Sequence, residues 1–455
     1  MNCIKIAVFA VLISTSAFAK WSPWLPSVEM QNSPTQSGRW LRSLIHMHSV
    51  FSHDACDGKP QTTNEDGTIQ INQKCLDQFK AALCGHHIDV IFLTEHRTHM
   101  AHTDFNNVLR HYQLDSYLID GPQMIGGEIS CPDFHQVKLF PGAENALMPL
   151  GLKTHPKLLP GLNMESTYGN LSPAASQNFK DAGALVGIPH LENERYSIER
   201  ILKIDPDYLE IYNIHANIEQ IYIKFNPIKI GAFLARLTGF LLNPLVKTDL
   251  AYLSFLKETK ASMRKWAQLV AHKRFPGIMG SDIHRNVLKL RMKDGDRFDS
   301  HRRMIRWFSN YIYVTGEVTR ESIMKSISEG RNMGVFEIFG SPNGFEFKAT
   351  KPNGEVIEMG AETNFVKGTV LTVRLPDNRP KYAVPYIKKA TSRGWVKVAK
   401  GKRKKDILTY VVKEPGVFKV DIRLRPLHMT RYMITKIGHL LRRYPWIYSN
   451  PIYLR

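Results

Sequence analysis

The chain has 455 residues and a formal net charge of +20, with 43% hydrophobic and 22% charged residues. This composition is typical of a globular protein and excludes a disordered or fibrous chain. The length is sufficient for two or three domains, and the positive charge favours contact with anionic surfaces or anionic substrates.

The first residues have the three-part pattern of a secretory signal peptide. A short basic start is followed by an apolar run over residues 6–13 and by Ala-Phe-Ala before Lys20. The pattern predicts a signal peptide over residues 1–19, cut after Ala19, and a periplasmic or secreted protein. A buried N-terminal helix is the alternative. Because an exported protein does not meet chromosomal DNA, we expect no specific nucleic-acid partner.

Removal of the signal peptide leaves four cysteines close together in the chain, namely Cys56, Cys75, Cys84 and Cys131. An even number of cysteines in an exported protein predicts disulfides, with three pairings that the sequence does not separate. We expect at least one bridge to hold the loop after Asp54. The alternative is that the cysteines bind a metal, but the CxxC spacing typical of such sites is absent from the sequence.

From residue 41 to residue 340, short apolar runs alternate with helix-like stretches such as "CLDQFKAALCGHH". Seven runs have the composition of buried parallel strands: "RSLIHMHS", "IDVIFLTEH", "MIGGEIS", "HQVKLFPG", "GALVGIPH", "DYLEIYN" and "PGIMGSDIH". The alternation predicts an α/β sheet or barrel, in which functional sites lie where the strands end.

Two segments depart from this alternation. Residues 217–273 are a predicted helical insertion, and their apolar stretch over residues 230–246 is too short and too interrupted to span a bilayer. This insertion is interpreted as a helical hairpin over the site or as an amphipathic element that touches a membrane. Over residues 341–455, Pro-Asn-Gly turns and alternating runs predict a small β-sandwich-like domain. Its basic "KGKRKKD" stretch predicts a solvated hairpin tip, with polyanion binding as the alternative.

Histidine, aspartate and glutamate residues stand where the predicted strands end. His46 and His48 lie two residues apart on one strand, so their side chains point to the same face, and Asp282 and His284 repeat this spacing. So many nitrogen and oxygen donors at strand ends predict a metal site, with isolated core histidines as the alternative. The predicted ligands are His46, His48, Asp54, His96, Glu128, His135, His190, Asp282 and His284.

The segments "HMHSVFSHD", "LTEH", "GGEIS" with His135, "VGIPH" and "GSDIH" resemble the successive motifs of the PHP (polymerase and histidinol phosphatase) superfamily. The resemblance covers residues 41–337 and implies a distorted (β/α)7 barrel with up to three divalent metals at its mouth. It implies that one metal is held by His46, His48, Glu128 and Asp282. Glu128 would bridge to a second metal, completed by His135 and His190. Asp54, His96 and His284 would hold a third.

The β-rich end and the tail "YPWIYSNPIYL" are similar to exported relatives of the CehA/McbA (carbaryl hydrolase-like) group. The chain departs from the PHP pattern at Glu95, where aspartate is usual, and at Pro189, which precedes His190 where many relatives have the proline after the histidine. Ligands of the predicted kind suit Zn, Mn or Fe, and we expect one to three ions per chain.

Attack by a metal-activated water is the predicted mechanism, because the sequence has no GxSxG nucleophile motif. The leading prediction is a phosphoesterase that acts on a small anionic or ester substrate. A carbamate or carboxylic ester hydrolase is the alternative, and a non-catalytic envelope protein that binds polyanions is another. The positive charge also predicts peripheral contact with an anionic membrane or lipopolysaccharide. The predicted catalytic residues are His46, His48, Glu128 and Asp282. Arg97 and Arg285 are candidates for substrate binding, with plain surface arginines as the alternative, and His99, His102 and His215 are candidates for proton transfer.

Overall fold

The structure is a computed structural model that describes residues 30, 32–34, 36–58, 61–63, 69–217, 247–286, 289, 291–377, 379–432 and 437–455. The fold is 27% helical and 34% strand. Among these residues, every helix is too short or too polar to cross a membrane. The predicted signal peptide over residues 1–19 and the apolar stretch over residues 230–246 lie outside the described residues.

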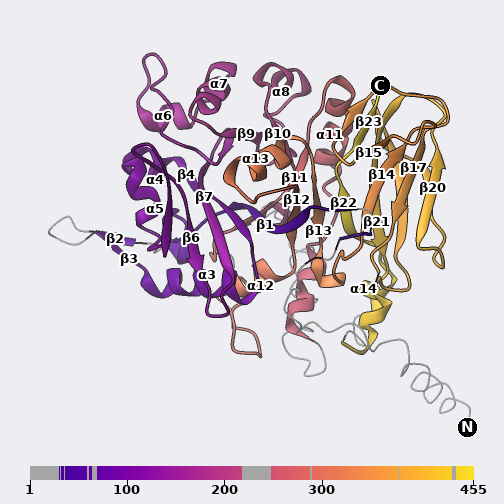
Figure 1. The fold of residues 1–455 in the computed structure, drawn as a ribbon. Helices are drawn as coiled ribbons and strands as arrows, with labels where there is room; N and C mark the ends of the chain where they lie inside the picture. The colour runs from indigo at the N-terminus through magenta and orange to yellow at the C-terminus, as the bar shows by residue number, and fades with distance from the viewer. Residues whose placement is uncertain are drawn as a thin grey trace, which may run out of the picture.

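Seven strands form a closed barrel at the centre of the molecule (Figure 1). Five of the seven neighbouring strand pairs are parallel, and one of these five, formed by the last and the first strand, closes the ring. The short fourth strand is antiparallel to both of its neighbours. In ring order the strands are β1 (Arg39–Met47), β4 (Val90–His96), β7 (Gln136–Glu144), β8 (Met148–Leu150), β9 (Leu185–Ile188), β10 (Tyr208–Asn213) and β11 (Gly277–Ile283).

The predicted (β/α)7 barrel is wrong, because the barrel is mixed, has further strands outside it and is not rich in helix. The predicted "GGEIS" strand lies in β6 (Gln123–Ser130), which is antiparallel to both β5 (Ser116–Asp120) and β7. Gly121 and Pro122 connect β5 to β6 as a hairpin, and Gly121 has the positive φ of 57° that a tight turn favours. Only three residues separate β7 from β8, which leaves no room for a helix there.

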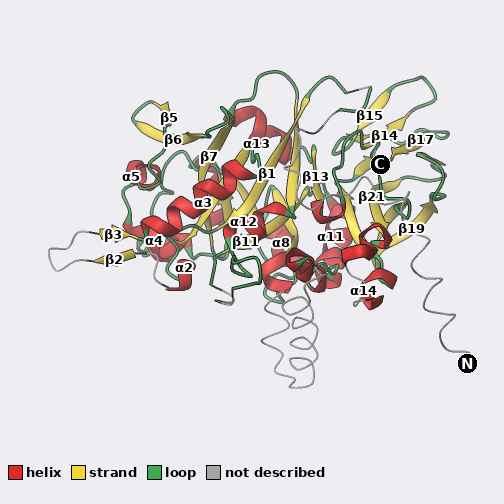
Figure 2. Ribbon diagram, turned by 90° about the horizontal axis from the view of Figure 1, so that it is seen from below, coloured by secondary structure: helices red, strands yellow, loops and turns green. Residues whose placement is uncertain are grey.

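Helices cover the barrel where the connections between strands are long (Figure 2). Seven of the described helices begin at side-chain caps. For example, Asn72 accepts a hydrogen bond from the backbone N–H of Cys75, and Ser172 accepts one from that of Ala175. The longer helices are α3 (Gln73–Gly85), α7 (Pro173–Asp181), α11 (Lys260–His272) and α13 (Arg320–Ser328). The shorter ones are α2 (Ala55–Gly58), α4 (Arg97–His102), α5 (Phe105–Arg110), α6 (Met164–Tyr168), α8 (Ile198–Ile204), η1 (Thr248–Ser254), α12 (His301–Arg306), η2 (Glu337–Phe339), η3 (Leu427–Tyr432) and α14 (Ile437–Leu441).

Strands outside the barrel extend its sheet toward the C-terminal region. β12 (Ser309–Val314) pairs with β1, β13 (Asn332–Val335) pairs with β12, and β22 (Tyr444–Ser449) pairs with β13. The same sheet continues through β16 (Glu362–Thr363), β18 (Val384–Thr391), β19 (Gly394–Lys400), β21 (Gly416–Leu424) and β23 (Ile452–Leu454). The β-rich end predicted for residues 341–455 therefore shares a continuous sheet with the barrel.

Four further strands of this region form a separate sheet in the order β15 (Val356–Glu358), β14 (Glu346–Thr350), β17 (Val370–Arg374) and β20 (Ile407–Val411). Phe347 and Val373 of this sheet and Phe418 of β21 are buried in the same apolar core. The rings of Tyr410 and Phe418 lie 6.4 Å apart, which places β20 next to β21. A small hairpin of β2 (Gln61–Thr63) and β3 (Ile69–Ile71) lies apart from both sheets.

Two disulfides connect the four cysteines that follow the predicted signal peptide. Cys56 pairs with Cys75, which ties the loop after Asp54 to α3. Cys84 pairs with Cys131, which ties the end of α3 to the turn after β6. The prediction that a bridge holds the loop after Asp54 is confirmed, and none of these four thiols remains to bind a metal.

Protonation of a buried histidine is expected to destabilise the fold in acid. His301 in α12 is 2% exposed, and its ring packs edge-on against Phe79 of α3 at a centroid distance of 5.5 Å. Burial, together with the charges of the nearby Arg285 and Arg297, lowers the pKa of His301 to about 3. Since the unfolded-state pKa is about 6.5, the contribution of a neutral His301 is complete above that pH. It declines toward pH 3, by up to ~1.4 kcal/mol per pH unit.

Urea unfolding of the parent and of a His301→Leu variant, between about pH 7 and pH 4, measures this contribution. The free energy of unfolding should fall less steeply with decreasing pH in the variant than in the parent. Equal pH dependence in the two proteins would show that protonation of His301 does not contribute to acid destabilisation.

Candidate metal centre

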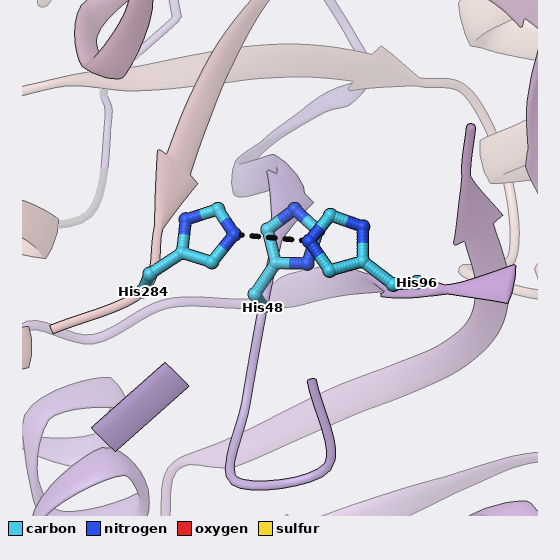
Figure 3. Close-up of side chains that lie close together, drawn as sticks. All are labelled: His48, His96 and His284. Carbon is cyan, nitrogen blue, oxygen red and sulfur yellow. Dashed lines mark hydrogen bonds between the residues drawn. The ribbon is translucent and has the colours of Figure 1, made fainter. Parts of the chain in front are cut away.

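The carboxyl ends of the barrel strands bring histidines and carboxylates from distant segments together. His48 follows β1, His96 ends β4 and His284 follows β11, and Figure 3 shows the rings of His96 and His284 pointing toward each other beside the ring of His48. Parallel strands end at the same edge of the barrel, which explains the convergence. We call the whole group the metal cluster: His46, His48, Asp54, His96, Glu144, His190, Glu210, His215, Asp282 and His284.

The floor of the metal cluster is a contact between two imidazoles and one carboxylate oxygen. His46 Nε2 lies 3.4 Å and His48 Nε2 lies 3.3 Å from Oδ1 of Asp282. Both histidines are fully buried, and Asp282 is 4% exposed. Among the described residues, neither Nε2 atom has a hydrogen-bond partner. These buried polar atoms therefore require an explanation.

The hydrogen-bond partner of Nδ1 determines which ring nitrogen carries the proton in His46 and in His48. His46 Nδ1 lies 2.6 Å from Oε1 of Glu210, and a carboxylate accepts this proton. His48 Nδ1 lies 2.9 Å from Oγ of Ser52, whose hydroxyl donates to Oε2 of Glu95 at 2.5 Å. Because the Ser52 proton is already used, its oxygen accepts the proton of His48 Nδ1. In the neutral form of each ring, Nε2 therefore presents a lone pair to Asp282.

Three lone-pair acceptors buried against one another repel unless a positive charge lies among them. Imidazole nitrogens and a carboxylate oxygen are the ligands that Zn²⁺ and related divalent ions accept. The orphaned Nε2 atoms and the oxygen of Asp282 thus fit a divalent cation. Hydrogen bonds from the far side of each ring, such as that of Glu210, are also typical of metal-binding histidines.

Several groups of described residues are arranged at metal-binding distance. In each group the ligand atoms lie within 4.8 Å of one another. The groups share members, so their centres are adjacent and more than one ion could be held. They are His46–His48–Asp282, His48–His96–His284, His46–His190–Glu210, His215–Asp282–His284 and His53–Asp54–His96.

The carboxylates dominate the electrostatics at the rim of the metal cluster. Burial alone would lower the pKa of His96, but hydrogen bonds with Asp54 and Glu144 raise it to about 10. Burial alone would raise the pKa of Glu144, but the hydrogen bond with His96 and the charges of nearby histidines lower it to about 2. The carboxylates are therefore ionised at neutral pH, as metal ligands must be.

At His46 the charges of Glu210 and Asp282 outweigh burial and raise the pKa, whereas at two other buried imidazoles burial has the larger effect. It is the main cause that lowers the pKa of His48 and of His284. These two rings therefore stay neutral, which is the state in which an imidazole binds a metal ion. The two rings are stacked, with a centroid distance of 3.9 Å.

Three members of the metal cluster have a backbone conformation that side chains other than glycine rarely adopt. The φ angles are 60° at His46, 46° at His190 and 48° at Asp282. Such conformations cost about 1–3 kcal/mol each and persist at functional sites where the surrounding structure imposes them. His46 and His48 do converge as predicted, although the regular alternation of a strand is interrupted at His46.

Two of the predicted ligands lie at the opposite end of the barrel. Glu128 is paired in register with Lys138, which aligns with Val90 at the start of β4, and it forms an ion pair with Lys138. His135 Nε2 lies 2.9 Å from the carbonyl oxygen of Ile88. Both residues line a cavity of about 350 Å³. The roles predicted for Glu128 as a bridging ligand and for His135 as a second-metal ligand are therefore corrected.

Glu144 and Glu210 lie in the metal cluster, where the sequence predicted Glu128 and His135. Glu144 ends β7 and lies 3.1 Å from His96 Nδ1 and 3.6 Å from His190 Nε2. Glu210 reaches His46 from β10 because Gly280 on the neighbouring strand has no side chain, and a Cβ there would overlap Glu210 Oε1. The sequence signal for Glu144 was its position at the end of an apolar run.

His215, a member of the metal cluster, and His53, beside it, differ from their predictions. His215 was predicted as a proton carrier, and its Nδ1 lies 3.4 Å from Oδ2 of Asp282, at ligand distance. His53 was not predicted as a ligand, yet its ring lies 5.0 Å from that of His96. Residues after Met47 lie outside β1, so the alternation of side chains along a strand does not predict the direction of His53.

The remaining predicted residues have other contacts. Arg97 forms an ion pair with Glu165 at 3.3 Å, and the same carboxylate lies 3.4 Å from His102 Nε2. His99 is stacked on Phe51, and burial lowers its pKa to about 4. Arg285 is half-buried, and its charged neighbours are Arg297, Asp57, Asp299 and Asp296. The structure thus brings none of these predicted substrate and proton-transfer residues to the metal cluster.

Replacing Ser52 with alanine is expected to weaken metal binding by about 10–100-fold. The substitution removes the acceptor for the proton on His48 Nδ1, so Nε2 is no longer held as the free nitrogen. Ser49→Ala is the matched control, because Ser49 is equally buried and its hydroxyl contacts Tyr112 at 2.8 Å. Calorimetric titration with Zn²⁺ or Mn²⁺ measures both affinities. An equal loss in the two variants would contradict the role of Ser52.

Comparison with known proteins does not extend this description. No family model, no curated protein and no solved structure matches the chain. The functional argument therefore rests on the geometry of the metal cluster.

Proposed function

We propose that the protein is a metal-dependent hydrolase, specifically a phosphoesterase that acts on a small anionic ester. The observation that carries the proposal is the contact of two bare imidazole nitrogens, of His46 and His48, with one oxygen of Asp282. Divalent ions at this centre would supply Lewis acidity toward a water molecule and an ester oxygen. The resemblance of the motifs to the PHP superfamily supports the same class of activity.

The metal cluster offers ligands for more than one ion, as many phosphoesterases require. His46, His48 and Asp282 would hold one ion at the floor. Asp54, His96 and His284 would hold another nearer to the solvent. Glu144, His190 and Glu210 complete the cluster: Glu144 contacts both His96 and His190, and Glu210 contacts His46.

The protein's own side chains orient this centre. Asn213 Nδ2 donates to Glu210 at 3.2 Å and to Asp282 at 3.1 Å, which couples the partner of His46 to the central carboxylate. The side chains of Asp54 and His190 are 36% and 23% exposed, whereas the floor is buried. A substrate would therefore approach across Asp54 and His190. The net charge of +20 favours an anionic substrate.

The proposal is tested on the purified protein loaded with Mn²⁺ or Zn²⁺. Bound metal is counted by elemental analysis after gel filtration, and hydrolysis is followed with p-nitrophenyl phosphate, bis-p-nitrophenyl phosphate and a naphthyl carbamate. We expect at least one ion per chain and release of p-nitrophenol from a phosphate ester. Turnover of the carbamate alone would assign the protein to ester or carbamate hydrolysis, and the absence of bound metal would overturn the metal-dependent mechanism.

A further inference from the structure

The two sheets of the C-terminal region have free edges that one short connection joins. Among the described strands, β19 pairs only with β18, and β20 pairs only with β17. Residues 401–406 connect β19 directly to β20, so the two edges lie on the same side of the molecule. Figure 1 shows β20 at the border of the molecule, away from the barrel.

This side of the molecule concentrates positive charge. Residues 396–413 contain seven lysine and arginine residues and a single carboxylate, that of Asp406. Asp406 already pairs with Arg379 at 2.5 Å, and Arg379 also donates to the carbonyl oxygens of Arg403 and Lys405. No other described residue of this segment forms an ion pair with a described carboxylate. The cations are thus presented to the solvent on a loop that Arg379 holds in place.

Apolar side chains border the cations on both strands. Val396 of β19 is 49% exposed, and Ile407 and Val411 of β20 are 52% and 57% exposed. Ile407 and Val411 are four residues apart on one strand and point to the same face. We call the whole surface the basic edge: Val396, Lys397, Lys400, Lys402, Arg403, Lys404, Lys405, Ile407, Val411 and Lys413.

We propose that the basic edge binds the surface of a bilayer that contains anionic phospholipid. A cluster of this many cations is attracted to anionic headgroups. Exposed aliphatic side chains beside the cations can enter the interface between headgroups and acyl chains. A soluble polyanion would satisfy the cations but leave Val396, Ile407 and Val411 in water, which favours the bilayer. This inference is independent of the proposed hydrolase activity.

Co-sedimentation of the full chain with vesicles tests the proposal. The protein should bind vesicles of phosphatidylcholine with phosphatidylglycerol, and salt should weaken the binding. It should not bind phosphatidylcholine alone. Charge reversal at Lys402, Arg403, Lys404 and Lys405, each to glutamate, should weaken the binding at least ~10-fold.

The matched control reverses four exposed lysines that are dispersed over the rest of the molecule and form no ion pair with a described residue. The control substitutions are Lys74→Glu, Lys157→Glu, Lys203→Glu and Lys260→Glu. The net charge changes equally in both variants, so the control should retain binding within ~3-fold of the parent. Equal loss in the two variants would assign the effect to net charge and overturn the proposal. Thermal unfolding confirms that both variants are folded.

A variant with Ile407→Ser and Val411→Ser separates a bilayer from a soluble polyanion. We expect it to bind the anionic vesicles more weakly and soluble polyphosphate unchanged. If the parent binds polyphosphate as tightly as vesicles, and this variant binds both like the parent, the basic edge is a polyanion site. The bilayer proposal would then be overturned.

Discussion

Replacing Asp282 with asparagine is expected to abolish tight metal binding and to reduce hydrolysis by more than about 100-fold. Loss of a side chain that only hydrogen-bonds to a metal ligand costs up to about 100-fold, and Asp282 is itself a proposed ligand. Asp282 is the carboxylate nearest to the free nitrogens of both His46 and His48, and its second oxygen lies 3.4 Å from His215. Asparagine has the same shape but no negative charge. Elemental analysis after gel filtration and calorimetric titration measure the loss.

Glu128→Gln is the control for this variant, because Glu128 is a carboxylate that the sequence motifs also suggested as a ligand. It lies at the opposite end of the barrel and pairs with Lys138 at a partly exposed position. We expect unchanged metal content and a change in unfolding free energy of at most about 1 kcal/mol. Loss of metal from Glu128→Gln with retention in Asp282→Asn would refute the placement of the centre.

We expect removal of Cys84–Cys131 to have the larger effect on stability and removal of Cys56–Cys75 to have the larger effect on metal binding. Cys84–Cys131 closes 47 residues and Cys56–Cys75 closes 19 residues. Removing the disulfide that closes the longer loop should lower the free energy of unfolding by about 4 kcal/mol, and removing the other should lower it by about 3 kcal/mol. Only Cys56–Cys75 holds the loop of Asp54, where the backbone N–H of Cys56 also donates to the carbonyl oxygen of His284 at 3.0 Å.

Double serine variants of each disulfide therefore give a crossed comparison. The Cys56→Ser, Cys75→Ser variant should lose bound metal or bind it at least ~10-fold more weakly, while remaining the more stable of the two. The Cys84→Ser, Cys131→Ser variant should unfold at lower denaturant concentration yet keep its metal while folded. Metal loss that simply follows stability in both variants would show that Cys56–Cys75 has no specific effect on the centre.

The sequence predicted which side chains lie close together where strands run parallel and end at the same edge. His46, His48, His96, Asp282 and His284 were found because each stands at the end of an apolar run. The expectation that the ends of apolar runs meet at one edge failed for Glu128, because an apolar run does not show whether its strand is parallel or antiparallel to its neighbours. The Asp-Gly turn at Gly121 was the available sign that β6 returns antiparallel to β5.

The two missed glutamates show a different limit. The predicted run "HQVKLFPG" ends at Gly142, but β7 continues for two more residues to Glu144. Glu210 lies within β10, and it reaches the centre through the space beside Gly280. That space is formed by a strand far away in sequence. The mixed barrel was likewise missed because β8 is three residues long and has no periodic pattern.

The anchoring of β11 by the C-terminal region has a consequence for folding during synthesis. Asn450 accepts a hydrogen bond from the N–H of Gly277 at 2.6 Å and donates to the carbonyl oxygens of Gly277 and Asn332. The strand that carries Asp282 is therefore incomplete until a segment more than 160 residues later has emerged. Contacts of such high sequence separation form slowly. The cluster of histidines and carboxylates should therefore assemble late, after the C-terminal segment has been synthesised.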